Sequence, residues 1–120
     1  MKKVMLLADR DLCDTFQSTL ESSYTILPCY DWATAVEMLR QDPEVLILNL
    51  LLPERDGLQF LREYRRSLPR RIIVLTPYLD CHISDDLFRL NVDAVLRLPI
   101  GAGCLGRKLE ELGIKKHPSR

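Results

Sequence analysis

Residues Pro43 to Leu58 read P-E-V-L-I-L-N-L-L-L-P-E-R-D-G-L, an apolar run followed by a turn. Every position from Val45 to Leu50 is apolar except Asn49, so the segment has no polar face to turn toward water. Such a run is typical of a strand that is buried on both faces of a parallel sheet. Proline and glycine at residues 53–57 then mark a turn before a helical pattern begins. We therefore expect a central strand here, followed by a helix.

The same unit, an apolar run followed by a segment of helical period, occurs five times along the chain. The expected strands are Lys3–Ala8, Tyr24–Cys29, Val45–Leu50, Arg71–Thr76 and Val92–Leu98. The expected helices are marked by Leu12, Cys13, Phe16 and Leu20; by Trp32, Ala35, Val36 and Leu39 behind an N-cap at Asp31; by Leu58, Leu61 and Tyr64 or Arg65; and by Ser84–Leu90 and Cys104–Leu112. This alternation predicts an α/β domain, with a doubly wound five-stranded parallel sheet and helices on both faces.

Length and charge limit the classes of function. The chain has 120 residues, and its 17 Lys plus Arg balance 17 Asp plus Glu. We expect one domain over residues 1–114, with 115–120 as a basic tail or the start of a linker. A net charge of zero disfavours direct nucleic-acid binding. The longest apolar run, Val45 to Leu52, is too short to span a membrane, and the N-terminus does not resemble a signal peptide. We therefore expect a cytoplasmic protein without membrane contact.

Residues at the carboxyl ends of the expected strands are the first candidates for function, because ligands of parallel α/β sheets bind beyond those ends. These residues are Asp9, Arg10, Asp11, Asn49, Thr76 and Leu98.

The strand-end residues and the Pro43–Leu58 stretch, with its Pro53, Asp56 and Gly57, resemble the receiver domain of two-component response regulators. The run I-I-V-L-T ending at Thr76, and Pro99 after the fifth strand, add to the resemblance, which extends over residues 2 to 113. It implies the CheY-like, flavodoxin-like (βα)5 receiver fold and a role in bacterial two-component or phosphorelay signal transduction.

The resemblance also implies which positions carry the chemistry, and several of them differ here. In the family, an aspartate at the end of the third strand accepts the phosphoryl group, but this chain has Asn49, whose amide is no comparable nucleophile. The lysine that contacts the phosphoryl group is replaced by Leu98, and the aromatic switch residue by Val95. Thr76 and Pro99 are retained. We therefore expect no phosphorylation at residue 49.

The acids that help to bind Mg²⁺ in the family are also altered. The first is Asp9, but the second is Arg10, whose positive charge opposes a hard cation that needs oxygen ligands. Asp11 matches a third acid that need not point to the same place. Cys13, Cys29, Cys81 and Cys104 lie far apart, so they favour buried thiols over a zinc site. We expect neither a metal nor another cofactor.

Three site residues each have a functional and a structural interpretation. Asn49 is either an uncharged stand-in within a locked signalling pocket or an amide that caps a strand end. Arg10 is either an internal cation paired with Asp9 or Asp11, or a solvated arginine. The Thr76 hydroxyl either binds a ligand oxygen or is satisfied by the backbone.

Two further motifs favour structural roles. Gly101, Gly103 and Gly106 spell G-x-G-x-x-G, but no further strand or acid at dinucleotide-site spacing follows, so we expect them to soften the start of the last helix. The basic cluster is typical of the solvated end of a helix, although it could also contact an acidic partner or nucleic acid. Its members are Arg62, Arg65, Arg66, Arg70 and Arg71.

The leading hypothesis is a non-enzymatic, phosphorylation-independent protein-interaction module. Its partner would be a signalling protein or a histidine kinase-like protein, or a second copy of the chain. The partner would bind the face formed by the fourth helix, fifth strand and fifth helix. One alternative is the N-terminal regulatory domain of a transcription factor whose DNA-binding domain follows Arg120. Another is a flavodoxin-like cofactor-binding protein, which Asp9 and Asp11 disfavour because carboxylates repel a flavin phosphate.

Overall fold

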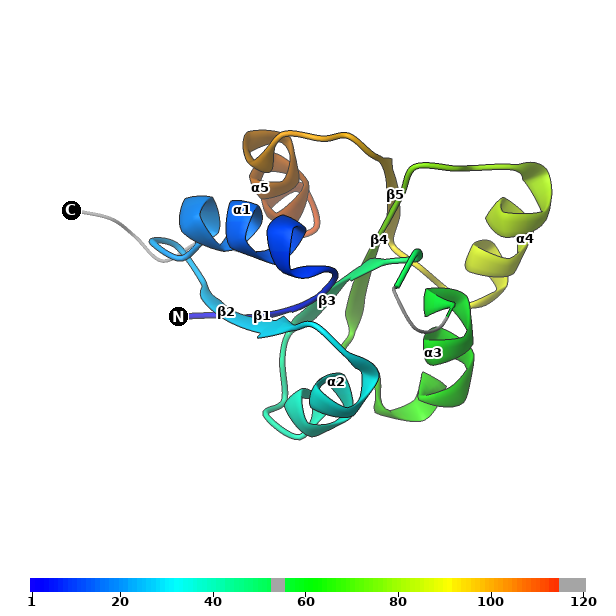
Figure 1. Cartoon of the computed structure of the whole chain (residues 1–120), viewed down its shortest axis with the longest axis horizontal. Coiled ribbons are helices and arrows are strands. Elements are labelled where there is room, and N and C mark those ends of the chain that lie inside the picture. The colour runs from blue at the N-terminus through cyan, green and yellow to red at the C-terminus, as the bar shows by residue number, and fades with distance from the viewer. Residues whose placement is uncertain (53–55, 115–120) are drawn as a thin grey trace.

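The computed structural model describes residues 1–52 and 56–114. In this part of the chain the strands form a five-stranded parallel sheet with the order β2-β1-β3-β4-β5. The elements are β1 Lys3–Leu7, α1 Arg10–Leu20, β2 Thr25–Cys29, α2 Trp32–Leu39, β3 Val45–Asn49, α3 Gly57–Glu63, the 3-10 helix η1 Arg65–Ser67, β4 Arg71–Thr76, α4 Cys81–Arg89, β5 Ala94–Arg97 and α5 Ala102–Glu111. Helices α1 and α5 cover one face of the sheet, and α2, α3 and α4 cover the other (Figure 1). The doubly wound (βα)5 architecture expected from the sequence is confirmed.

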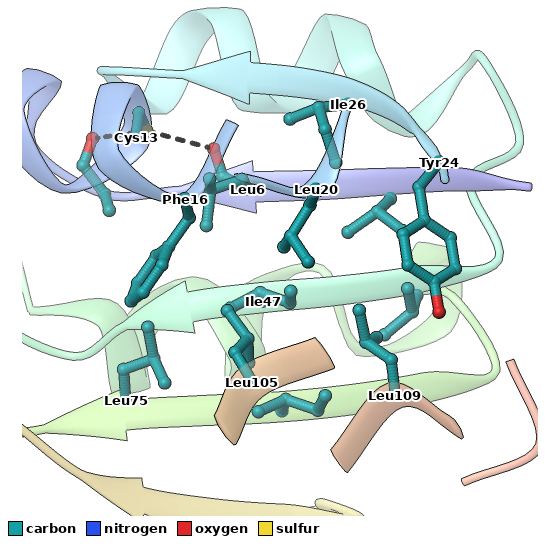
Figure 2. Close-up of a cluster of buried hydrophobic side chains, with 14 of the residues drawn as sticks. Leu6, Cys13, Phe16, Leu20, Tyr24, Ile26, Ile47, Leu75, Leu105 and Leu109 are labelled. Atoms are coloured by element: carbon teal, nitrogen blue, oxygen red, sulfur yellow. Dashed lines mark hydrogen bonds between the residues drawn. The ribbon is translucent and has the colours of Figure 1, made fainter. Parts of the chain in front are cut away.

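The three central strands are buried on both faces, which explains their lack of polar alternation. Successive residues of one strand enter different halves of the core. Ile47 of β3 packs on the side of α1 and α5, whereas Leu46 and Leu48 pack on the side of α2, α3 and α4. Figure 2 shows the first half, in which Phe16 of α1 and Leu105 of α5 belong to one cluster over the sheet.

Several element boundaries differ from the sequence prediction. Helix α4 begins at Cys81 instead of Ser84, because the Asp80 carboxylate accepts a hydrogen bond from the Ile83 N–H at 2.9 Å and caps an earlier start. Helix α5 begins at Ala102 instead of Cys104. Strand β5 is shorter than the expected Val92–Leu98, since the Val92 N–H bonds back to the Leu87 carbonyl and closes α4.

Helix α2 is less deeply buried than expected. Only Ala35 is fully buried, whereas Trp32, Val36 and Leu39 are half-buried, so their expected inward placement is only partly right. The Trp32 ring instead packs edge-on against Phe60 of α3, with ring centroids 5.0 Å apart. The α2 helix therefore lies on the α3 helix as well as on the sheet.

Helix α3 ends at Glu63, and this decides between Tyr64 and Arg65 as the inward residue. Tyr64 is half-buried, and its hydroxyl accepts a hydrogen bond from Trp32 Nε1 at 3.1 Å. Arg65 is exposed and begins η1.

The end of α5 is fixed to the core. The Ile114 N–H bonds to the Leu109 carbonyl at 2.9 Å, and the Gly113 N–H bonds to the Glu110 carbonyl at 3.0 Å. Gly113 has φ +82°, so these two bonds form a Schellman motif with glycine at its left-handed position. The buried Tyr24 hydroxyl donates a hydrogen bond to the Ile114 carbonyl at 3.0 Å. The expected tail, residues 115–120, and Pro53 of the expected turn lie outside the described residues.

No helix within the described residues is both long enough and apolar enough to cross a lipid bilayer.

The expected burial of the cysteines is confirmed for Cys13 and Cys29, and it is wrong for Cys81 and Cys104, whose thiols are exposed. Burial raises the pKa of Cys13 to about 11 and that of Cys29 to about 12. The Cys13 Sγ also lies 3.5 Å from the Ala8 carbonyl, within the cluster of Figure 2. Since the thiolate is the reactive form, both thiols should react slowly with alkylating reagents, because they are buried and because they stay protonated.

We expect iodoacetamide to label Cys81 and Cys104 in the native protein, and Cys13 and Cys29 only after denaturation. Peptide mass spectrometry after a short pulse at mildly alkaline pH measures this difference, with the denatured chain as the control for intrinsic reactivity. Equal labelling of the buried and exposed pairs in the native protein would contradict it.

Candidate functional site

The sheet brings the candidate residues of β1, β3 and β4 to one edge. Asp9 follows the end of β1, Asn49 is the last residue of β3, and Thr76 is the last residue of β4. In the β3–β4 register, Asn49 lies opposite Leu75, the residue before Thr76. Leu98 reaches the same edge, since its N–H donates to the Thr76 carbonyl at 2.9 Å.

Aspartates at this edge are used to begin helices. Four helices have an N-cap aspartate whose carboxylate accepts a hydrogen bond from a backbone N–H of the first turn. The pairs are Asp9 with Leu12 at 3.3 Å, Asp31 with Thr34 at 2.7 Å, Asp56 with Leu58 at 3.0 Å, and Asp80 with Ile83 at 2.9 Å. The hydrogen bonds from Thr34 lower the pKa of Asp31. Asp9, which the resemblance assigns to metal binding, is therefore already engaged as the cap of α1.

Arg10 has a partner that the sequence analysis missed. It is the first residue of α1, its side chain is exposed, and its guanidinium carbon lies 4.2 Å from the centre of the Tyr30 ring. This is a cation–π contact. Among the described residues, no ion pair joins Arg10 to Asp9 or Asp11. An aromatic residue directly after β2, at the same sheet edge, was the sequence signal for this contact.

Asn49 closes the turn after β3. Its side chain is 7 % exposed, and its Oδ1 accepts a hydrogen bond from the Leu51 N–H at 3.1 Å. One residue further on, the Leu50 carbonyl accepts a hydrogen bond from the Gly57 N–H at 2.8 Å. The amide is thus buried, uncharged and hydrogen-bonded within its own turn, which is the arrangement that the strand-capping interpretation describes.

The Thr76 hydroxyl is also bonded to its own loop. It is 1 % exposed, donates a hydrogen bond to the Tyr78 carbonyl at 2.7 Å and accepts one from the Tyr78 N–H at 3.2 Å. A ligand oxygen would have to displace the Tyr78 carbonyl to receive this proton. In this conformation the hydroxyl therefore stabilises the loop between β4 and α4 through its two hydrogen bonds to the Tyr78 backbone.

The remaining candidate positions are apolar. Val95 is half-buried against the core on the side of α2, α3 and α4, and Leu98 is half-buried against the core on the side of α1 and α5. Pro99 is exposed and follows a cis peptide bond. None of these three side chains offers a charge or a hydrogen-bonding group to the site.

These residues do not fit the Mg²⁺ ion that the fold family implies. A hard divalent cation needs several oxygen ligands, preferably carboxylates. At the positions that the resemblance assigns to metal and phosphoryl binding, the site provides a single carboxylate, that of Asp9, and the neutral amide of Asn49. Over residues 1–52 and 56–114, no group of three or more His, Cys, Asp or Glu side chains could hold a metal ion.

No model of a known protein family matches the sequence. Solved structures match it well in shape. A CheY-like response regulator receiver domain protein from Methanospirillum hungatei is 18 % identical, with a TM-score of 0.82 over 93 % of each chain. The signal receiver domain of a putative LuxO repressor from Vibrio parahaemolyticus is 23 % identical, with a TM-score of 0.75 over 93 % of this chain and 96 % of that chain.

A third solved structure also matches the chain in shape. It is a response regulator from Burkholderia pseudomallei with a phosphorylated aspartic acid, a calcium ion and citrate, and it is 19 % identical to this chain. The TM-score is 0.80, and the match covers 94 % of this chain and 71 % of that one. The chain therefore has the fold of the receiver domains of response regulators.

Proposed function

We propose that the chain is an atypical receiver domain of bacterial two-component signalling that acts as a protein-interaction module without phosphorylation at residue 49. The observation that carries this proposal is the buried, uncharged Asn49, whose side-chain oxygen is already bonded to the Leu51 N–H. A neutral amide at this position cannot form an acyl phosphate. In this proposal the protein is a binding module and not an enzyme.

The neighbouring positions support the same conclusion. Asp9 caps α1, Arg10 lies over Tyr30, and Leu98 packs into the core. Together with Asn49 these side chains carry no net charge, so neither a divalent cation nor a phosphoryl group has a complementary site. Regulation, where it occurs, would come through binding of a partner.

The face formed by α4, β5 and α5 is the proposed binding surface for a signalling protein, a histidine kinase-like protein or a second copy of the chain. Phe88 of α4 is 83 % exposed, although a phenylalanine side chain gains from burial. Strand β5 is at the edge of the sheet and pairs only with β4 among the described strands. An exposed aromatic side chain and an open strand edge both favour contact with another protein.

The test is incubation of the chain with acetyl phosphate and Mg²⁺, followed by measurement of the intact mass. We expect no phosphoryl adduct, because no carboxylate lies at position 49 and the acid at position 9 is engaged. A receiver domain with an intact acceptor aspartate, treated in parallel, is the control for the donor. A stoichiometric adduct on a residue of this sheet edge would overturn the proposal.

A second candidate function is the regulatory domain of a transcription factor. The likeness to the receiver domain of a putative repressor favours it, and the fixed position of Ile114 would give a following domain a defined point of attachment. Sequencing the gene beyond the codon for Arg120 tests this candidate. A stop codon directly after Arg120 would exclude it.

A further inference from the structure

We propose that an acidic segment of a partner protein binds the arginine surface formed by Arg65, Arg66 and Arg70. This surface lies between α3 and β4, and Arg70 directly precedes the first residue of β4. It is therefore at the amino edge of the sheet, opposite the edge that carries Asn49 and Thr76. The inference goes beyond the proposed function, because it concerns a different surface and does not depend on the phosphorylation state.

The charges on this surface are not neutralised within the described part of the protein. Arg62 pairs with Asp86 of α4 at 3.2 Å, and Arg71 pairs with Asp93 at 3.2 Å. The charges of Arg62 and Arg71, at the two ends of the cluster, are therefore balanced by carboxylates within the protein. By contrast, Arg65, Arg66 and Arg70 are exposed, and none of them forms an ion pair with a described carboxylate.

The arginine surface borders a hollow at one of its three members, Arg70. The volume of the hollow is about 580 Å³, and Arg70 forms part of its wall together with Leu68, Pro69, Pro43 and Leu112, whereas Arg65 and Arg66 do not line it. The half-buried Leu68 and Pro69 join the exposed arginines to the hollow along one continuous piece of chain. A bound segment could place carboxylates on the arginines and one apolar side chain against Leu68 and Pro69, at the wall of the hollow next to Arg70.

The arrangement of charge favours an acidic protein segment over a nucleic acid. The lining of the hollow also includes Asp42 and Glu44, and Glu44 already pairs with Lys2 at 3.0 Å. A phosphate backbone that continued across the hollow would meet these carboxylates, whereas a protein segment can change from acidic to apolar within one residue. The chain's own segment 115–120 is basic, so its charges would be repelled by the arginines and it is not the proposed occupant. Arginine forms planar, bidentate pairs with carboxylates, which suits this partner.

The experiment is a fluorescence anisotropy titration of the full chain with a labelled short peptide of glutamates and aspartates around a central leucine. The test variant is R65Q/R66Q/R70Q. For a charge-matched control, the single variant R70Q is compared with R40Q, because Arg40 is exposed but neither lines the hollow nor belongs to α4, β5 or α5. We expect saturable binding that weakens with salt, and a loss of affinity of about tenfold for the test variant because exposed ion pairs are individually weak.

Three outcomes would overturn the proposal: no saturable binding at low salt, equal weakening by R70Q and R40Q, or tighter binding of a single-stranded oligonucleotide of equal charge that needs the same arginines. Replacing the central leucine of the peptide with glycine should weaken binding, because the apolar contact with Leu68 and Pro69 is lost. The acetyl phosphate experiment does not involve these arginines, so failure of one proposal leaves the other standing.

Discussion

Replacing Gly57 with alanine is expected to lower the free energy of unfolding by about 3 kcal/mol, at the upper end of the usual cost of overpacking. A Cβ atom on Gly57 would lie 2.9 Å from the Cα of Leu50 and 3.0 Å from the carbonyl oxygens of both Asn49 and Leu50. These neighbours are backbone atoms of the turn after β3, which cannot rotate away as a side chain can. The Gly57 N–H also bonds to the Leu50 carbonyl at 2.8 Å, so separation of the two segments would break that bond.

Urea denaturation monitored by circular dichroism measures this loss, and Gly103→Ala is the matched control. Gly103 lies within α5, and a Cβ atom there would meet nothing within 4 Å. Since alanine has the higher helix propensity, Gly103→Ala should raise the free energy of unfolding by up to about 1 kcal/mol. The same substitution should therefore have opposite signs at the two positions. A stabilising or neutral Gly57→Ala would show that the turn after β3 is not as close to α3 as described.

Restoring Asn49→Asp alone is expected to leave the chain unlabelled by acetyl phosphate and Mg²⁺, whereas the triple variant Arg10→Asp/Asn49→Asp/Leu98→Lys should gain one phosphoryl group. The single change supplies a nucleophile but no second acid at position 10. At the positions that the resemblance assigns to metal binding, a cation that needs several oxygen ligands would have only the new carboxylate and that of Asp9. Leu98 would still offer no positive charge to the phosphoryl oxygens. The triple change supplies the acid and the ammonium group that the resemblance to receiver domains places at these positions.

Intact mass and peptide mapping measure the outcome. The double variant Arg10→Asp/Leu98→Lys, which keeps Asn49, is the matched control and should remain unlabelled. The new carboxylate at position 49 would occupy a position that is only 7 % exposed, so burial of its charge could destabilise the fold. Circular dichroism therefore checks that each variant is folded. Efficient labelling of Asn49→Asp alone would show that the substitutions at positions 10 and 98 matter less than their chemistry indicates.

The fold could be read almost completely from the sequence, because the pattern that encodes it is local. Val45–Leu48 is apolar at every position since both faces of β3 are covered, and the predicted Arg71–Thr76 matches β4 at both ends. One error has a local source and another a tertiary source. The Asp80 carboxylate caps the Ile83 N–H and so starts α4 earlier than its apolar residues indicate, and Trp32 is shared between the sheet and Phe60 of α3.

The sequence also identified the residues at the site positions, but it did not identify the residues that they contact. Asn49 and Leu98 exclude an acyl phosphate and a lysine contact by their chemistry alone. That Arg10 lies over Tyr30 depends on the parallel register of β1 and β2, which places the residues after these two strands side by side. The cap that the one remaining family acid of the pair, Asp9, forms on α1 is a local contact with Leu12, which the apolar pattern did not reveal. Hydrophobic periodicity is repeated over many residues and so survives in the sequence, whereas a single polar contact depends on the position of one neighbour that only the folded sheet supplies.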